Sequence, residues 1–213
     1  MMYQRIRKGG VPEQVLEGLY ERLGSARVLF LYGTITGMKD GPRMDPFAPH
    51  YIADSLLAMG HESSDPIWLT VDTPGGDVNS GMVLYDAMQL CPAPIYTLGR
   101  NSMSMGAIIL AGGEPGHRYV YPHARTMLHQ PEAAMQGDVS KMQIMYDEMD
   151  RIYDTLIATI INNGCGRSEL EIKEDLRHER WMNGQETIDY GLADNLITQK
   201  DLYNRPVSEL EAK

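Results

Sequence analysis

The chain has 213 residues, a formal net charge of −10 and a hydrophobic fraction of 43%, which suit a globular protein with one domain. Its acidity argues against a nucleic-acid partner, because phosphate binding needs clustered Lys and Arg. The two cysteines, Cys91 and Cys165, form no C-x-x-C pair, so we expect a reducing compartment and no disulfide scaffold or structural zinc site. The sequence has no secretory signal and no apolar run that could span a bilayer, so we expect a cytoplasmic protein without a membrane partner.

Short β-rich runs alternate with segments of helical spacing, a pattern typical of an α/β fold. In chain order we predict a strand over 27–32, a surface loop over 37–49, a helix around 52–57, a strand over 67–71, a helix around 82–88, a strand over 95–98, a small helix ending at Leu110, and two strands over 118–121 and 126–129. Pro122 separates the last two strands.

The longest predicted helix covers 137–163, where apolar residues, many of them methionines, recur at three- and four-residue intervals. It stops at Gly164, and shorter helices are predicted near 168–176 and 185–190, before a polar, loose tail after Lys200. The methionine stripe indicates either burial in the core or packing against a second subunit, because methionine adapts well to interfaces.

Ser104 is the candidate nucleophile. The P-loop, H-E-x-x-H and G-x-S-x-G motifs do not occur. Ser104 follows a predicted strand and precedes a small helix, whose first-turn N–H groups have no intrahelical partner and suit an oxyanion. A second N–H from the turn at Gly75 and Gly76 would complete a two-donor hole. The alternative is that Ser104 is only a helix N-cap and 73–76 only a turn.

His129 is the candidate general base, which a serine nucleophile needs beside it. Six histidines are available: His50, His61, His117, His123, His129 and His178. His129 ends a β-rich run and is followed by Gln130 and Pro131, so it lies at a strand end, where catalytic side chains often project. A lone histidine in such a place is more often structural.

Five short motifs follow one another along the chain. They are Thr73-Pro74-Gly75-Gly76, Ser104-Met105-Gly106-Ala107, Met127-Leu128-His129-Gln130-Pro131, Gln136-Gly137 and Tyr190-Gly191-Leu192. In this order they resemble the proteolytic subunit of the Clp protease (the ClpP family), over about 17–198. Each motif alone is weak, but five in register favour the family over the two structural alternatives for Ser104 and His129.

The resemblance implies an α/β, crotonase-like fold of stacked β-β-α units with a projecting handle helix at about 130–163. It implies an N-terminal axial segment over 1–16, a peptidase domain over 17–198 and a polar tail over 199–213. Subunits of one or two kinds would form stacked heptameric rings. A hexameric AAA+ ATPase would deliver unfolded polypeptides to them, and neither cofactor nor metal would be needed.

On the same grounds the chain would be a serine-type endopeptidase in which Ser104 attacks, His129 transfers the proton and a third residue orients His129. The implied site residues are catalytic Ser104, His129 and Glu179, the oxyanion donors Gly76 and Met105, and Gln136 and Gly137 beside an extended substrate strand.

The sequence departs from the family pattern at several positions. Glu179 stands where aspartate is usual, although Ser-His-Glu triads work in other hydrolases; Asp175 is the fallback, and a Ser-His dyad is the other alternative. Other departures are Ser102-Met103 in place of two small residues, Arg177-His178 in place of the acidic-Arg pair through which rings sense each other, and Trp68 and Thr70 in the ATPase-docking cleft.

Two other functions compete with an active peptidase. The first is a weakly active or inactive scaffold subunit of a mixed ring, which the departures at Glu179 and Met103 favour. The second is an acyl-CoA enzyme of the crotonase type, which shares the fold but predicts glutamates at the oxyanion helix, where this sequence has none.

Overall fold

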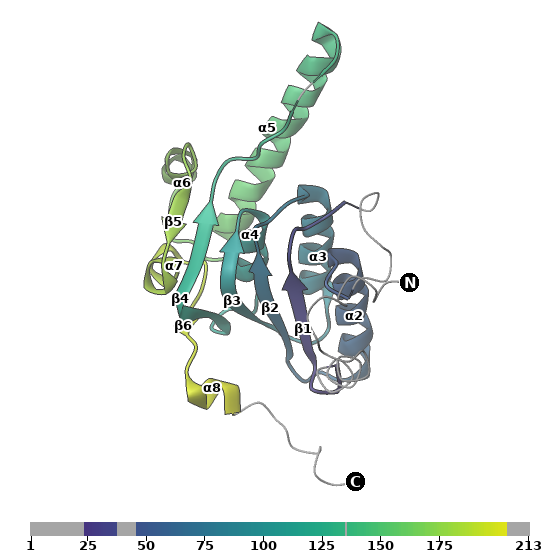
Figure 1. Ribbon diagram of the computed structural model, residues 1–213, viewed down its shortest axis with the longest axis vertical. Helices are drawn as coiled ribbons and strands as arrows, with labels where there is room; N and C mark the ends of the chain where they lie inside the picture. Colours follow the sequence, from purple (N-terminus) through teal and green to yellow (C-terminus); the bar gives the residue numbers. More distant parts are fainter. Residues whose placement is uncertain (1–23, 38–45, 135, 204–213) are drawn as a thin grey trace, which may run out of the picture.

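The computed structural model describes residues 24–37, 46–134 and 136–203. Its centre is a β-sheet whose strands alternate with helices along the chain (Figure 1). The expected axial segment over 1–16 lies outside the described residues, as do residues 38–45 of the predicted loop. Within the described part, no helix is long and apolar enough to cross a membrane.

Four strands lie side by side in chain order and run parallel: β1 (Val28–Tyr32), β2 (Ile67–Thr73), β3 (Ile95–Met103) and β4 (Arg118–Leu128). β5 (Arg180–Met182) pairs antiparallel with the end of β4, and β6 (Asn195–Leu196) pairs parallel with its beginning. Because parallel strands run in one direction, the segments that follow β2, β3 and β4 come together at one edge of the sheet.

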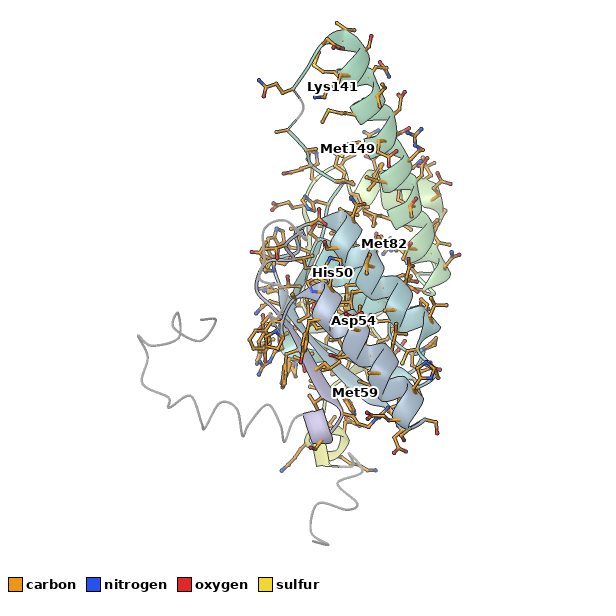
Figure 2. All side chains as sticks on the ribbon, turned by 90° about the vertical axis from the view of Figure 1, so that its right-hand side faces the viewer. His50, Asp54, Met59, Met82, Lys141 and Met149 are labelled. Atoms are coloured by element: carbon orange, nitrogen blue, oxygen red, sulfur yellow. The ribbon has the colours of Figure 1, made fainter. Side chains whose placement is uncertain are left out.

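Helices α2 (Pro49–Glu62), α3 (Val78–Leu90) and α4 (Met105–Ala111) pack on one face of the sheet, and α2 and α3 lie next to each other in Figure 2. The core between the layers contains Leu31 and Leu69 from strands and Ile52, Leu56 and Leu84 from helices, all at most 1% exposed. Each such side chain contributes about 1.5–3 kcal/mol by leaving water. Packing of this core fixes the positions of the strand ends next to which the site residues lie.

The other face of the sheet carries a second, aromatic cluster. Trp68 is 6% exposed, stacks on Tyr119 at a centroid distance of 5.4 Å and meets Tyr96 edge-on. Thr70 is 3% exposed. Both residues that the resemblance assigns to a docking cleft therefore belong to the packed part of this single chain.

β4 corrects the prediction of two strands over 118–121 and 126–129, because it is one continuous element. It pairs with β3 first through Arg118 to Val120 and then through Arg125 to Met127, with a shift of register between. Pro122 lies in the stretch between the two paired segments. Its missing N–H therefore costs no ladder hydrogen bond, so proline is tolerated here without ending the strand.

The long helix α5 (Val139–Asn162) extends beyond the body of the fold (Figure 1), and Figure 2 shows Lys141 and Met149 on the extending part. Val139 and Ile144, near its beginning, are 79% and 66% exposed, whereas Ile157 and Ile160, near its end, are 1% exposed. In the single chain, only the last turns of this apolar, methionine-rich stripe are therefore buried in the core.

The chain closes with α6 (Glu169–Asp175), α7 (Gly184–Tyr190) and α8 (Gln199–Tyr203). Complete capping boxes begin α6 and α7, as Ser168 with Glu171 and Asn183 with Glu186. The prediction of a loose tail is wrong for its first residues, because α8 is helical through Tyr203. The N–H and hydroxyl of Thr198 both donate to Asp201, which supports that helix start.

Candidate active site

Ser104 lies between the end of β3 and the first residue of α4, in a backbone conformation that side chains rarely adopt. Its φ is +54° and its ψ is −122°, a strained geometry that costs roughly 1–3 kcal/mol and is typical of functional sites. Its N–H donates to the Met127 carbonyl at 2.7 Å, which holds the residue against the end of β4. The Ser104 hydroxyl makes no capping bond to α4, so its side chain does not act as an N-cap.

His129 directly follows β4 and faces Ser104 across the gap between the ends of β3 and β4. Its Nε2 lies 2.9 Å from the Ser104 Oγ, a hydrogen-bond distance. The His129 side chain is 19% exposed. The structure therefore brings the expected serine and histidine together at the distance that proton transfer between Oγ and Nε2 requires.

The turn at Gly75 and Gly76 lies against Ser104 and is held by Ile35. The Ile35 N–H donates to the Gly75 carbonyl and its carbonyl accepts from the Asp77 N–H, both at 2.8 Å. In the described part of the chain, the N–H groups of Gly76 and Met105 donate to no other backbone group. A β-carbon added to Gly75 would lie 3.1 Å from the Met105 nitrogen, so the turn and the start of α4 are immediate neighbours.

Glu179 lies just beyond the pairing of β4 with β5. Leu128 and Arg180 form the last pair of this antiparallel ladder, and His129 and Glu179 are the next residue on either side. The Glu179 carboxylate, however, accepts a hydrogen bond from the Trp181 indole N–H at 2.9 Å. Within the described residues it forms no ion pair with His129.

Asp175, the fallback, is engaged elsewhere. Its carboxylate lies 2.7 Å from an Arg180 nitrogen and 3.6 Å from an Arg167 nitrogen. The carboxylate that does approach the outer nitrogen of His129 belongs to Glu132, whose Oε1 lies 3.6 Å from Nδ1. Sequence reasoning missed Glu132, although its position three residues after His129 in a turn-forming segment was a usable signal.

A small apolar pocket opens beside the pair. Its lining comprises Ser104, His129, Val78, Met105, Ile108, Leu128, Pro131, Tyr153, Leu156, Ile160 and Leu176. Burial raises the pKa of the Tyr153 phenol, so this group stays protonated and neutral at physiological pH. An uncharged wall next to a nucleophile can accept an apolar side chain but disfavours a charged one.

The remaining predicted positions are less tightly connected to the pair. Gln136 and Gly137 lie exposed on the segment that leads from β4 to α5, and no hydrogen bond in the described residues joins them to Ser104 or His129.

Ser102 is buried, and its hydroxyl donates to the Val71 carbonyl at 3.3 Å. Arg177 pairs with Glu174 of its own chain at 3.1 Å. Among the described residues, no group of three or more His, Cys, Asp and Glu side chains could hold a metal ion.

Comparison with known proteins identifies the family. Residues 13–200 match the family model described as Clp protease, so the protein is a peptidase by class. The chain belongs to the Clp protease family.

Similar proteins named ATP-dependent Clp protease proteolytic subunit 2 occur in several bacteria. That of Corynebacterium glutamicum is 34% identical over 181 residues, covering 84% of this chain and 86% of the relative. The relative from Rhodococcus jostii is 33% identical over 184 residues, covering 86% and 90%. That of Mycolicibacterium paratuberculosis is 32% identical over 185 residues, covering 86% and 88%.

These comparisons confirm the resemblance seen in the five motifs and the α/β fold that it implies. The chain is a subunit of the Clp protease type. Neither the inactive scaffold nor the acyl-CoA enzyme is favoured over that assignment.

Proposed function

We propose that this chain is a serine-type endopeptidase subunit in which Ser104 is the nucleophile and His129 the general base. The contact of 2.9 Å between the Ser104 Oγ and the His129 Nε2 carries the proposal. The backbone of Ser104 also supports it. Its positive φ costs conformational free energy, and residues strained in this way cluster at active sites.

The reaction begins when the Ser104 Oγ attacks the carbonyl carbon of the peptide bond and its proton passes to the His129 Nε2. The N–H groups of Gly76 and Met105 receive the negative oxygen of the tetrahedral intermediate. The C–N bond then breaks, and the leaving amine takes the proton from Nε2. Water, deprotonated by the same nitrogen, releases the acyl group and regenerates the Ser104 hydroxyl.

Glu179 is proposed as the residue that orients His129 and stabilises the imidazolium. Its support is the β4–β5 register, whose last pair, Leu128 with Arg180, lies next to both residues; one further pair in the same register would bring their β-carbons to about 4.5–5.5 Å. A glutamate is long enough to bridge that distance. Reaching the Nδ1 requires its carboxylate to turn from Trp181 toward His129.

Substrates are proposed to be unfolded polypeptides that a hexameric AAA+ ATPase delivers, in the cytoplasm, to stacked heptameric rings of one or two kinds of subunit. An extended chain would bind beside Gln136 and Gly137. The exposed apolar residues Val139, Ile144 and Tyr146 of α5 support assembly, because such a surface is usually covered by a partner. The native mass of the purified protein tests this assembly.

A fluorophosphonate probe, which reacts with activated serines, tests the catalytic proposal on the full chain. We expect the wild type to be labelled and Ser104→Ala to lose both the label and peptide hydrolysis, by a factor of roughly 10³ or more. Ser102→Ala is the matched control, since the Ser102 hydroxyl is buried against Val71, and it should keep both. An unlabelled wild type beside a labelled known serine hydrolase contradicts the proposal.

A further inference from the structure

We propose that Glu132 is a second positioning residue for His129. It holds the imidazole in its working tautomer through the Nδ1. The inference rests on the proposed function, because it concerns the same serine and histidine. It assigns a role to a residue on the segment after β4, which the strand register would not identify.

The geometry at the two ring nitrogens carries the inference. The His129 Nε2 lies 2.9 Å from the Ser104 Oγ, while the Nδ1 lies 3.6 Å from the Glu132 Oε1. The second distance exceeds that of a hydrogen bond, but the negative charge of an ionised carboxylate attracts a proton to the nearer nitrogen and cannot supply one itself. A proton on Nδ1 is therefore favoured by Glu132, and Nε2 is left with the lone pair that must accept the Ser104 proton.

Glu179 does not fill this role in the arrangement observed. Its carboxylate accepts from the Trp181 indole N–H at 2.9 Å and, within the described residues, forms no ion pair with His129. The other acidic neighbour, Asp175, is paired with Arg180 and Arg167. Among the described residues, Glu132 is thus the carboxylate within ion-pair distance of the Nδ1.

The local chain explains why Glu132 can reach. Pro131 fixes one backbone dihedral between His129 and Glu132, and the Gln130 N–H donates to the Leu176 carbonyl at 3.1 Å. These two constraints limit the course of the chain between His129 and Glu132. Because the Glu132 side chain is 82% exposed, water screens the pair. Its loss should therefore have a modest effect as long as Glu179 can turn from Trp181 and replace it.

The test compares peptide hydrolysis by Glu132→Gln in the wild type and in a Glu179→Gln background, with Glu114→Gln as a matched control for loss of an exposed charge. In the wild type we expect kcat to fall about twofold to fivefold with KM unchanged. In the Glu179→Gln background, where no other carboxylate orients His129, we expect a fall of roughly tenfold or more. If Glu132→Asp keeps the wild-type kcat, the role belongs to the carboxylate and not to packing of the side chain.

A Glu132→Gln variant that matches the control in the Glu179→Gln background would overturn the inference. A second measurement separates this failure from failure of the proposed function. Nitrogen-15 NMR of labelled histidines in the sedimented assembly reports which ring nitrogen of His129 carries the proton, whether or not the protein hydrolyses peptides. We expect the Nδ1–H tautomer in wild type and a mixture in Glu132→Gln/Glu179→Gln; identical tautomers in both would also overturn it.

Discussion

Gly75 lies so close to Ser104 that a β-carbon on Gly75 would stand 2.7 Å from the Ser104 β-carbon and 2.7 Å from the Met103 carbonyl oxygen. Gly75 also has a φ of +90°, which disfavours any other residue. The turn after β2 and Ser104 after β3 can therefore pack this closely only because residue 75 has no side chain.

Replacement of Gly75 by alanine is expected to disturb the site more than the fold as a whole. The new methyl group must displace Ser104 or Met103, and a shift of about 1 Å at a catalytic group can cost about a hundredfold in rate. The measurement is kcat for peptide hydrolysis, with the melting temperature recorded in parallel. Gly116→Ala is the control, because Gly116 has a similar φ of +86° but open space around it. An equal loss of activity in both variants would contradict the prediction.

The apolar pocket beside His129 is expected to select the residue that precedes the cleaved bond. Peptides with leucine or methionine there should have a higher kcat/KM than peptides with aspartate or lysine, because the lining is mostly apolar and contains no Asp, Glu, Lys or Arg to pair with a charged group. Differences of one methylene in such a pocket change the rate about 10–200-fold.

Leu156→Trp tests whether this pocket sets that preference. Leu156 lines the pocket and is partly buried, so the larger ring should reduce kcat/KM for leucine peptides relative to alanine peptides. Leu170→Trp serves as the control, since Leu170 is 79% exposed on α6. An unchanged ratio of the two substrates in Leu156→Trp would show that another surface selects the side chain.

Arg118 and Asp194 are expected to be a main source of stability away from the site. The Arg118 side chain is 7% exposed, bonds the Asp194 carboxylate at 2.5 and 2.9 Å and donates to the carbonyls of Ala111, Asn163 and Gly191. Removing one partner of a buried pair costs about 3–5 kcal/mol. Arg118→Ala should therefore lower the melting temperature by roughly 6–20 °C at the 2–4 °C per kcal/mol usual for this size.

The same pair predicts how stability depends on pH. Burial alone raises the pKa of the Asp194 carboxyl, but the hydrogen bonds from the Arg118 side chain and from the N–H groups of Arg118 and Gly116 outweigh it, so the net pKa is lowered. A carboxyl with a lowered pKa in the folded state stabilises the fold above its unfolded pKa. That contribution disappears as the pH falls below about 4.

Unfolding by urea between pH 3 and pH 6 checks this. Wild type should lose free energy of unfolding toward pH 3 more steeply than Asp194→Asn, which lacks the ionisable group. Asp54→Asn, at an exposed position on α2 (Figure 2), should follow the wild type. If Asp194→Asn loses stability with the same slope as wild type, the acid-sensitive group lies elsewhere.

The sequence predicted the elements whose patterns are local. The buried runs of β1 and β2 and the apolar spacing of α3 appear close to their predicted positions, because each is bounded by turn residues such as Gly33 and Gly75. Pro122 led to the wrong prediction of two strands. A proline ends a strand only if its N–H would take part in the ladder, and that depends on the register with β3. Such pairings between distant segments cannot be read from one strand.

The same difference between local patterns and long-range pairing applies to the site. Ser104 and His129 could be singled out by their positions at a helix start and a strand end, but their separation of 2.9 Å depends on the parallel pairing of β3 with β4. The position of Glu132 made it a candidate partner of the Nδ1, but the choice between Glu132 and Glu179 depends on the rotamers that the two side chains adopt. The Glu179 carboxylate accepts from the Trp181 indole N–H, and Trp181 belongs to no motif that would have predicted this contact.

Trp181→Phe is expected to make His129 less dependent on Glu132. Phenylalanine keeps an aromatic ring on β5 but removes the N–H that the Glu179 carboxylate now accepts at 2.9 Å. Because Glu179 and His129 both adjoin the last pair of the β4–β5 ladder, we expect its released carboxylate to turn to the Nδ1. The loss of kcat caused by Glu132→Gln should therefore be smaller in a Trp181→Phe background than in wild type. If the loss is the same in both backgrounds, Trp181 does not restrain Glu179, and the contact between them is incidental to catalysis.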